Sequence, residues 1–204
     1  MAKNKTNSKV LSGAFERAIC RLLSMWWSLG KDDNVFYRTE GSGGRATKRA
    51  RAGKGKQSRC GDVGLVEQTG KPFLDMFAVE IKKGYSKDTI QDLLDKPGVA
   101  AQTYETWLEQ ARESKQNSGS FSWMIIVRRK KRKSLVMLPA KLWAGLTSEE
   151  PQPFATLHID AETIIVLPLD HFTENVKPNH VRSIMWADNQ GEPPPGLAYD
   201  PELK

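Results

Sequence analysis

The chain has 204 residues, of which 39% are hydrophobic and 27% charged, and a formal net charge of +7. This length suffices for one domain with a buried core, and two distant cysteines argue against both a disulfide framework and a cysteine-based zinc site. No stretch approaches the roughly 20 apolar residues of a membrane span, and residues 1–9 lack the apolar core of a signal peptide. We therefore expect a soluble, cytoplasmic protein that does not act at a membrane.

The first half of the chain is expected to hold one long helix and three strands. Residues 1–9 are predicted to be disordered, and apolar residues at helical spacing predict a helix over residues 10–29. Further strands are expected over residues 35–38, 62–66 and 74–82, with a turn at 68–71. The last two strands are expected to form a β-hairpin.

The second half is expected to alternate helices and strands. The expected helices cover residues 99–114, 141–146 and 169–175, after a short helical turn at 89–94. The expected strands cover residues 121–127, 134–138, 154–159 and 163–167. This order predicts an α/β fold with a central mixed β-sheet flanked by helices, and residues 191–204 are expected to be a flexible tail.

Positive charge is concentrated in two segments. The first is a Gly- and Ser-rich connection over residues 44–61. The summed charge of its basic residues equals the net charge of the whole chain, and these residues are Arg45, Lys48, Arg49, Arg51, Lys54, Lys56 and Arg59. The second is a run of six basic residues at 128–133, including Arg128, Arg129, Lys130 and Lys131. Such concentration indicates a polyanion partner. The alternatives are a solvated linker for the first segment, and for the second a solvated hairpin tip that protects a sheet edge.

A Glu-x-Lys tripeptide occurs three times, and only one copy has the geometry of a site. Glu113 and Lys115 lie at the end of an expected helix, where residues two apart diverge, and the copy at 202–204 lies in the expected tail. Glu80 and Lys82 end an expected strand, so their side chains share one face while Phe77, Val79 and Ile81 face the core. With Asp62 on a neighbouring strand, they could bind a divalent metal and activate water against a phosphodiester.

The ordered set of residues around this motif resembles a known family. Glu16, Arg38, Ser42-Gly43, Asp62 and Glu80-Ile81-Lys82-Lys83 together resemble the archaeal-type Holliday junction resolvases of the PD-(D/E)XK nuclease superfamily. The resemblance covers residues 11–110 and implies a restriction-endonuclease-like core over residues 10–138. Residues 139–190 would then form a β-rich extension of the same domain. The Ser-Gly-Gly-Arg-Ala-Thr run also resembles that of phage proteins of similar length. This resemblance implies a phage-encoded protein that is located in the cytoplasm of a bacterial host.

The resemblance implies a role for each matched residue. Asp62 and Glu80 would ligate Mg²⁺, for which Mn²⁺ would substitute, with the main-chain carbonyl of Ile81. Lys82 would orient or deprotonate the attacking water, and Glu16 would complete the acidic cluster. Ser42 would lie beside the scissile phosphate, and Gln102 matches a supporting polar residue. Arg38 and Lys83 join the basic residues above as candidate DNA contacts. The non-catalytic alternatives are that Glu16 is a solvated helix residue, that Ser42 only forms a turn and that Gln102 is exposed on the surface.

These observations predict a metal-dependent DNA endonuclease that is selective for branched DNA, with a homodimer as one possible assembly. The long basic connection and the segment after residue 138 depart from the resolvase pattern, so substrate preference stays open. One alternative is a nicking or restriction-like endonuclease acting on duplex DNA. Another is a non-catalytic DNA-binding protein with a nuclease-like fold. A nucleotide cofactor is not expected, because the chain contains no Gly-x-x-x-x-Gly-Lys-Ser/Thr run.

Overall fold

The computed structural model describes residues 7–39, 61–84, 89–92, 101–147, 154–159 and 161–189. The helices are α1 (Asn7–Trp27), α3 (Lys71–Met76), α5 (Ala101–Ser118), α6 (Ala140–Leu146), α7 (Leu169–Asn175) and α8 (Pro178–Asn189). The strands are β1 (Phe36–Arg38), β2 (Val63–Leu65), β3 (Phe77–Gly84), β4 (Ser122–Arg129), β5 (Ser134–Pro139), β6 (Ala155–Ile159) and β7 (Glu162–Pro168). None of the described helices is long and apolar enough to cross a membrane.

A five-stranded mixed sheet forms the centre of the fold, as the sequence predicted. Its order is β3-β4-β5-β7-β6, with β3 and β4 parallel and the other neighbours antiparallel. The parallel pair requires a crossover, which α5 supplies. The two strands of the C-terminal extension, β6 and β7, continue this sheet, and the extension also contributes α6, α7 and α8.

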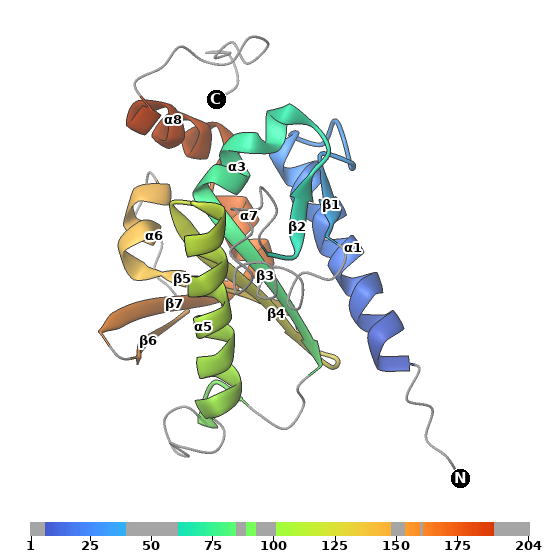
Figure 1. Ribbon diagram of the computed structural model, residues 1–204, viewed down its shortest axis with the longest axis vertical. Coiled ribbons are helices and arrows are strands. Elements are labelled where there is room, and N and C mark those ends of the chain that lie inside the picture. The colour runs from blue at the N-terminus through green and yellow to red at the C-terminus, as the bar shows by residue number, and fades with distance from the viewer. Residues whose placement is uncertain are drawn as a thin grey trace.

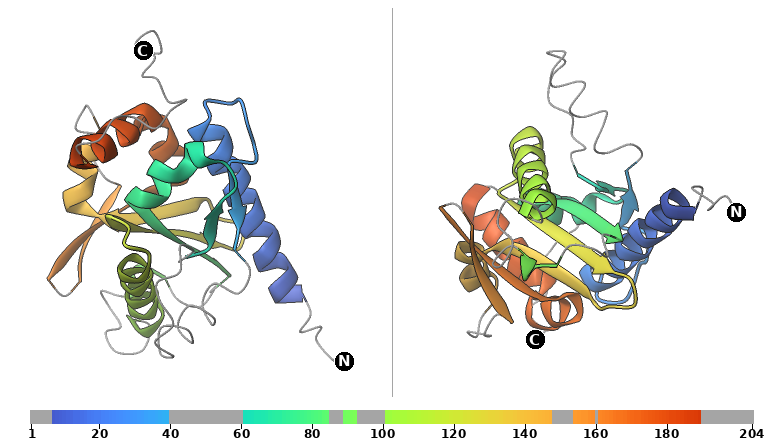
Figure 2. Two further views of the ribbon diagram at one scale, coloured as in Figure 1. Left: turned by 45° about the horizontal axis from the view of Figure 1, so that its top comes forward. Right: turned by 90° about the horizontal axis from the view of Figure 1, so that it is seen from below.

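Helices cover both faces of this sheet (Figure 1, Figure 2). On one face α5 packs its buried stripe, which includes Tyr104, Trp107 and Leu108, against alternate residues of β4 and β7. On the other face α1, α3, α6, α7 and α8 share the larger core, with Trp27, Phe73 and Phe172 among its fully buried side chains. Successive side chains of β3 therefore point alternately toward α5 and toward the larger core on the other face.

The predicted hairpin of the second and third strands is wrong. β2 pairs with β1, with Tyr37 opposite Gly64, in a separate two-stranded antiparallel sheet. The residues expected to continue a turn and a strand instead form a 3₁₀ turn (Gln68–Gly70) and α3, with Pro72 near the start of that helix. These helical turns redirect the chain, so β3 begins at Phe77 rather than at residue 74.

Helix α1 begins at Asn7, within the stretch that was expected to be disordered. The basic connection at 45–59, Ser42 and the tail at 191–204 lie outside the described residues. The strands expected at 121–127 and 134–138 form a hairpin, because β4 and β5 pair with Val127 opposite Leu135 and carry the basic run at their turn.

Candidate active site

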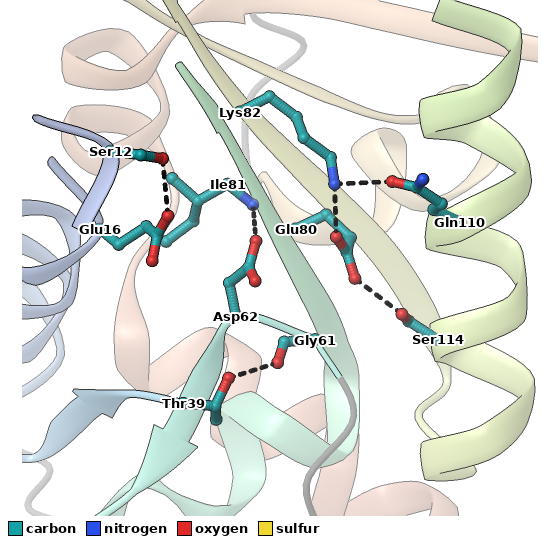
Figure 3. Close-up of polar contacts among 10 residues, drawn as sticks. All are labelled: Ser12, Glu16, Thr39, Gly61, Asp62, Glu80, Ile81, Lys82, Gln110 and Ser114. Carbon is teal, nitrogen blue, oxygen red and sulfur yellow. Dashed lines mark hydrogen bonds and ion pairs between the residues drawn. The ribbon is translucent and has the colours of Figure 1, made fainter. Parts of the chain in front are cut away.

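Strand β3 is an edge strand, and the start of the β2 segment is attached to its open edge. The main-chain N–H of Asp62 donates to the Val79 carbonyl at 2.7 Å. The Asp62 carboxylate in turn accepts from the main-chain N–H of Ile81, also at 2.7 Å. These two hydrogen bonds, of which Figure 3 shows the one from Ile81, fix Asp62 to the middle of β3, and Asp62 is only 6% exposed.

Gly61 allows this close attachment. Its φ of +93° lies in the region that favours glycine, and a Cβ there would lie 2.5 Å from the Val79 carbonyl oxygen. Thr39, which follows β1, adds further support: its hydroxyl donates to the Gly61 carbonyl at 2.7 Å and its N–H donates to the Asp62 carbonyl at 3.1 Å. The backbone around Asp62 is therefore held from two strands at once.

We expect Gly61→Ala to lower both stability and activity. The positive φ costs a side chain roughly 1–3 kcal/mol, and the contact with Val79 must push Asp62 away from β3. Gly30→Ala is the matched control, since Gly30 has a similar φ of +83° but open space around it. Thermal unfolding should show a lower Tm for both variants and a larger drop for Gly61→Ala, whereas DNA cleavage should fall only in Gly61→Ala. Equal behaviour of the two variants would contradict this role for Gly61.

Glu80 and Lys82 share the α5 face of β3, as the period of two predicted. The Lys82 Nζ lies 2.7 Å from Glu80 Oε2, and the two side chains are 14% and 8% exposed. Phe77, Val79 and Ile81 belong to the core on the opposite face. The alternation thus brings an ammonium and a carboxylate into direct contact near the edge where Asp62 is attached.

Helix α5 supplies two polar partners that the sequence did not indicate. The Ser114 hydroxyl donates to Glu80 Oε1 at 2.7 Å, and the Gln110 side-chain oxygen accepts from Lys82 Nζ at 2.8 Å. Because these residues are four apart, they lie on one face of the helix (Figure 3). This i, i+4 spacing was the available signal, but it looks the same on a solvated helix face.

The predicted supporting residue Gln102 lies in the first turn of α5, eight residues before Gln110. At a rise of 1.5 Å per residue that is about 12 Å along the helix axis. The side chain of Gln102 lies outside the described part of the structure. Gln110 is the glutamine that contacts the Glu80–Lys82 pair.

Glu16 lies on α1, on the other side of β3, and is paired with the Arg38 guanidinium. It also accepts a hydrogen bond of 2.8 Å from the Ser12 hydroxyl. Within the described residues, no three Asp, Glu, His or Cys side chains are grouped so that they could hold a metal ion. In this arrangement of the described side chains Glu16 is not grouped with Asp62 and Glu80, and its role in an acidic cluster stays a prediction.

The carboxylates of Asp62 and Glu16 both affect the pKa of the buried Cys20 thiol on α1. Cys20, one helical turn after Glu16 and 2% exposed, has its pKa raised to about 12, first by burial and then by the charges of Asp62 and Glu16. Arg38 acts in the opposite direction. The thiol thus stays protonated over the whole physiological pH range and is not a nucleophile.

The donors at the edge of β3 fit a small, hard divalent ion. The N–H and C=O of one strand residue point to the same side, so the carbonyl of Ile81 faces the edge to which Asp62 is attached. Asp62, which is bonded to the Ile81 N–H, and Glu80, the preceding strand residue, each carry a carboxylate. Two carboxylates and one carbonyl suit Mg²⁺, which keeps several of its waters and takes the rest of its ligands from substrate phosphates.

The predicted DNA contacts are distributed over three surfaces. Lys83 and Arg128 are register partners on the α1 face, and their charged groups lie 5.5 and 5.8 Å from the centre of the Phe15 ring. Arg129 has the opposite orientation, toward the α5 face, while Lys130 and Lys131 form the exposed turn of the β4–β5 hairpin. Of the other candidates, Arg38 is paired with Glu16, and those at 45–59 lie outside the described residues.

Residues 7–183 match the family model described as "Phage putative PDDEXK endonuclease". The chain belongs to this phage PD-(D/E)XK endonuclease family. Comparisons with curated proteins and with solved structures found no match. Membership places the chain in the PD-(D/E)XK nuclease superfamily, with DNA as the class of substrate, and the matched range extends through β6, β7 and α7 into α8. The matched range thus includes the C-terminal extension up to residue 183.

Proposed function

We propose that the chain is a Mg²⁺-dependent endodeoxyribonuclease whose site is Asp62, Glu80, Ile81 and Lys82. The observation that carries the proposal is the attachment of Asp62 to Ile81 beside the Glu80–Lys82 contact. This arrangement assembles an acidic pair and an ammonium from segments far apart in the sequence. A protein that only bound DNA would gain nothing from placing two buried carboxylates where phosphates approach.

The residues divide the chemistry among them. Asp62, Glu80 and the Ile81 carbonyl would hold Mg²⁺, which when bound supplies Lewis-acid activation of water and of the scissile phosphate. An ammonium has three N–H donors, and Glu80 and Gln110 accept two of those of Lys82. The third can donate to the attacking water or to a phosphate oxygen, where the positive charge offsets the charge that develops in the transition state.

Ser114 and Gln110 act on this chemistry through Glu80 and Lys82. Each holds one of the two charged groups in its orientation against β3, as outer partners of a metal site do. Their loss should leave the reaction slower but not abolished.

We expect Ser114→Ala to lower Mg²⁺-dependent cleavage by about 10- to 100-fold, the usual cost of losing such an outer partner. The Mg²⁺ concentration for half-maximal cleavage should rise, because the Glu80 carboxylate loses its orienting donor. Ser118→Ala is the control, since the Ser118 hydroxyl donates to main-chain carbonyls of the same helix and not to Glu80. An unchanged Mg²⁺ dependence in Ser114→Ala would show that this hydroxyl has no part in the site.

We further propose a preference for branched DNA, cleavage in the bacterial cytoplasm, and Mn²⁺ as an alternative ion. The support for branched DNA is the order of Glu16, Ser42-Gly43, Asp62 and Glu80–Lys82, which resembles the junction resolvases. A homodimer is included in this proposal because two incisions are needed to resolve a four-way junction.

Wild-type cleavage of matched DNAs tests the proposal. A four-way junction, a flap and a linear duplex of shared sequence would be incubated with Mg²⁺, with Mn²⁺ and with EDTA. The proposal expects metal-dependent cleavage, fastest on the junction. Equal cleavage of all three would favour the nicking or restriction-like alternative, and salt-sensitive binding without cleavage would favour the non-catalytic one.

A further inference from the structure

A cavity of about 530 Å³ lies on the α5 face of the sheet, the face to which Lys82 also projects. Its wall includes Val127 and Arg129 of β4. In the parallel pairing of β3 and β4, Val127 is the register partner of Lys82, and Arg129 is the partner of Gly84. Since paired strands lie roughly 4.8 Å apart, the cavity opens one strand away from Lys82.

Helix α5 contributes residues both to the cavity and to the contacts of Lys82. Tyr104 lines the cavity, and Gln110, six residues later on the same helix, accepts a hydrogen bond from Lys82. Six residues correspond to about 9 Å along a helix. The cavity therefore lies on the same face of the sheet as the proposed site, about 9 Å along α5 from the Gln110–Lys82 contact.

The cavity has an apolar interior and a basic rim. Ile90, Tyr104, Val127 and Leu135 line the interior, and these residues pack with the core layer under α5. The rim carries Arg129, Lys131, Arg132 and Lys133, of which Lys133 is paired with the exposed Asp170. The described residues of the lining include no acidic side chain. An apolar interior suits the face of a base, and a cationic rim suits the phosphates that flank it.

We propose that this cavity binds one unpaired nucleotide of the DNA next to the scissile phosphate. A cavity of this volume holds one small ligand, so a base-paired duplex cannot enter it, whereas a single extruded nucleotide can. Extrusion is least costly where pairing is already absent, as at a branch point, a bulge or a mismatch. The inference rests on the proposed function and gives it a physical source of selectivity for interrupted duplexes.

Equilibrium binding in EDTA tests the cavity without requiring cleavage. The probes are a fluorescent duplex and the same duplex with a one-nucleotide bulge, with Kd measured by anisotropy. The wild-type chain should bind the bulged DNA roughly 5- to 100-fold more tightly, the range that base stacking on a protein surface provides. Equal Kd values for the two DNAs would overturn the proposal.

Two variants change the cavity in different ways. Leu135→Trp fills the interior and should bring the ratio of the two Kd values close to one, with the Kd for plain duplex unchanged. Arg132→Ala removes an exposed rim charge without touching the core, and it should weaken binding of the bulged DNA more than that of the duplex. Lys130→Ala is the control, because Lys130 lies in the same turn but outside the lining. It should change both Kd values by the same factor.

A wild-type ratio that persists in both Leu135→Trp and Arg132→Ala would overturn the cavity assignment. Failure of the proposed function would look different. In that case the binding ratio would remain while no DNA was cleaved with Mg²⁺ or Mn²⁺.

Discussion

Glu80→Gln is expected to lower the single-turnover rate of Mg²⁺-dependent DNA cleavage by more than about 100-fold, beyond the range seen when an outer partner of a metal site is lost. Glutamine has nearly the shape of glutamate, and its one side-chain oxygen can accept from Lys82 while its NH2 group donates to the Ser114 hydroxyl oxygen. It lacks the negative charge that a divalent ion requires of this position. The variant therefore separates the charge of Glu80 from its packing.

Glu162→Gln is the matched control for this experiment. Glu162 is a half-buried carboxylate, less buried than Glu80, and is paired with Arg112 of α5 at 2.9 Å on the same face of the sheet. Its substitution also removes an ion pair between a carboxylate and a basic side chain. It should nevertheless change the cleavage rate by less than about twofold. A Glu80→Gln protein that cleaved as fast as the control would remove Glu80 from the site.

Lys82→Ala is expected to lower the cleavage rate by about 100- to 1,000-fold, which is typical when a group that stabilises developing charge is removed. The carboxylates remain, so the Mg²⁺ concentration for half-maximal rate should shift little. Loss of rate without loss of metal response distinguishes Lys82 from Glu80. Single-turnover kinetics across a Mg²⁺ titration measure both quantities at once.

Lys71→Ala provides the comparison for Lys82. Lys71 also donates to a carboxylate, that of Asp75, at 2.5 Å, but on the exposed face of α3. Its loss removes the same charge and the same type of ion pair without approaching β3. If both lysine variants lost the same small fraction of activity, the effect of Lys82 would reflect net charge and not its place in the site.

Much of the fold was predictable because its elements have strong internal periodicity. Helices α1 and α5 have apolar stripes at helical spacing, and β4 and β5 are apolar runs interrupted by a basic turn. The errors arose where the pattern was short. The residues before Phe77 continue the apolar run of β3, so nothing local distinguishes the end of α3 from the start of a strand.

Helix α8 was not predicted. Its signals are Pro178 at its first residue and the buried Val181 and Met185, four residues apart. This evidence is brief, and the helix is stabilised by packing against distant parts of the chain. The Arg182 side chain, for example, donates to the Trp27 carbonyl and lies 4.3 Å from the centre of the Trp27 ring. Such contacts cannot be read from local sequence.

The candidate site was predictable in its strand and less so in its surroundings. The period of two in β3 correctly placed Glu80 with Lys82, and chain order pointed to Asp62. Gln110 and Ser114 were missed because polar residues beside an apolar stripe are the normal exposed face of an amphipathic helix. Only the packing of α5 against β3 shows that these two residues face the site.

The single-turnover cleavage rate of a four-way junction by the wild-type chain, measured from EDTA through increasing Mg²⁺, tests the metal-dependent site most directly. We expect no cleavage in EDTA and a rate that rises with Mg²⁺ to a plateau. Cleavage that persisted in EDTA, or no cleavage at any concentration of Mg²⁺ or Mn²⁺, would contradict a metal-dependent site at Asp62, Glu80 and Lys82.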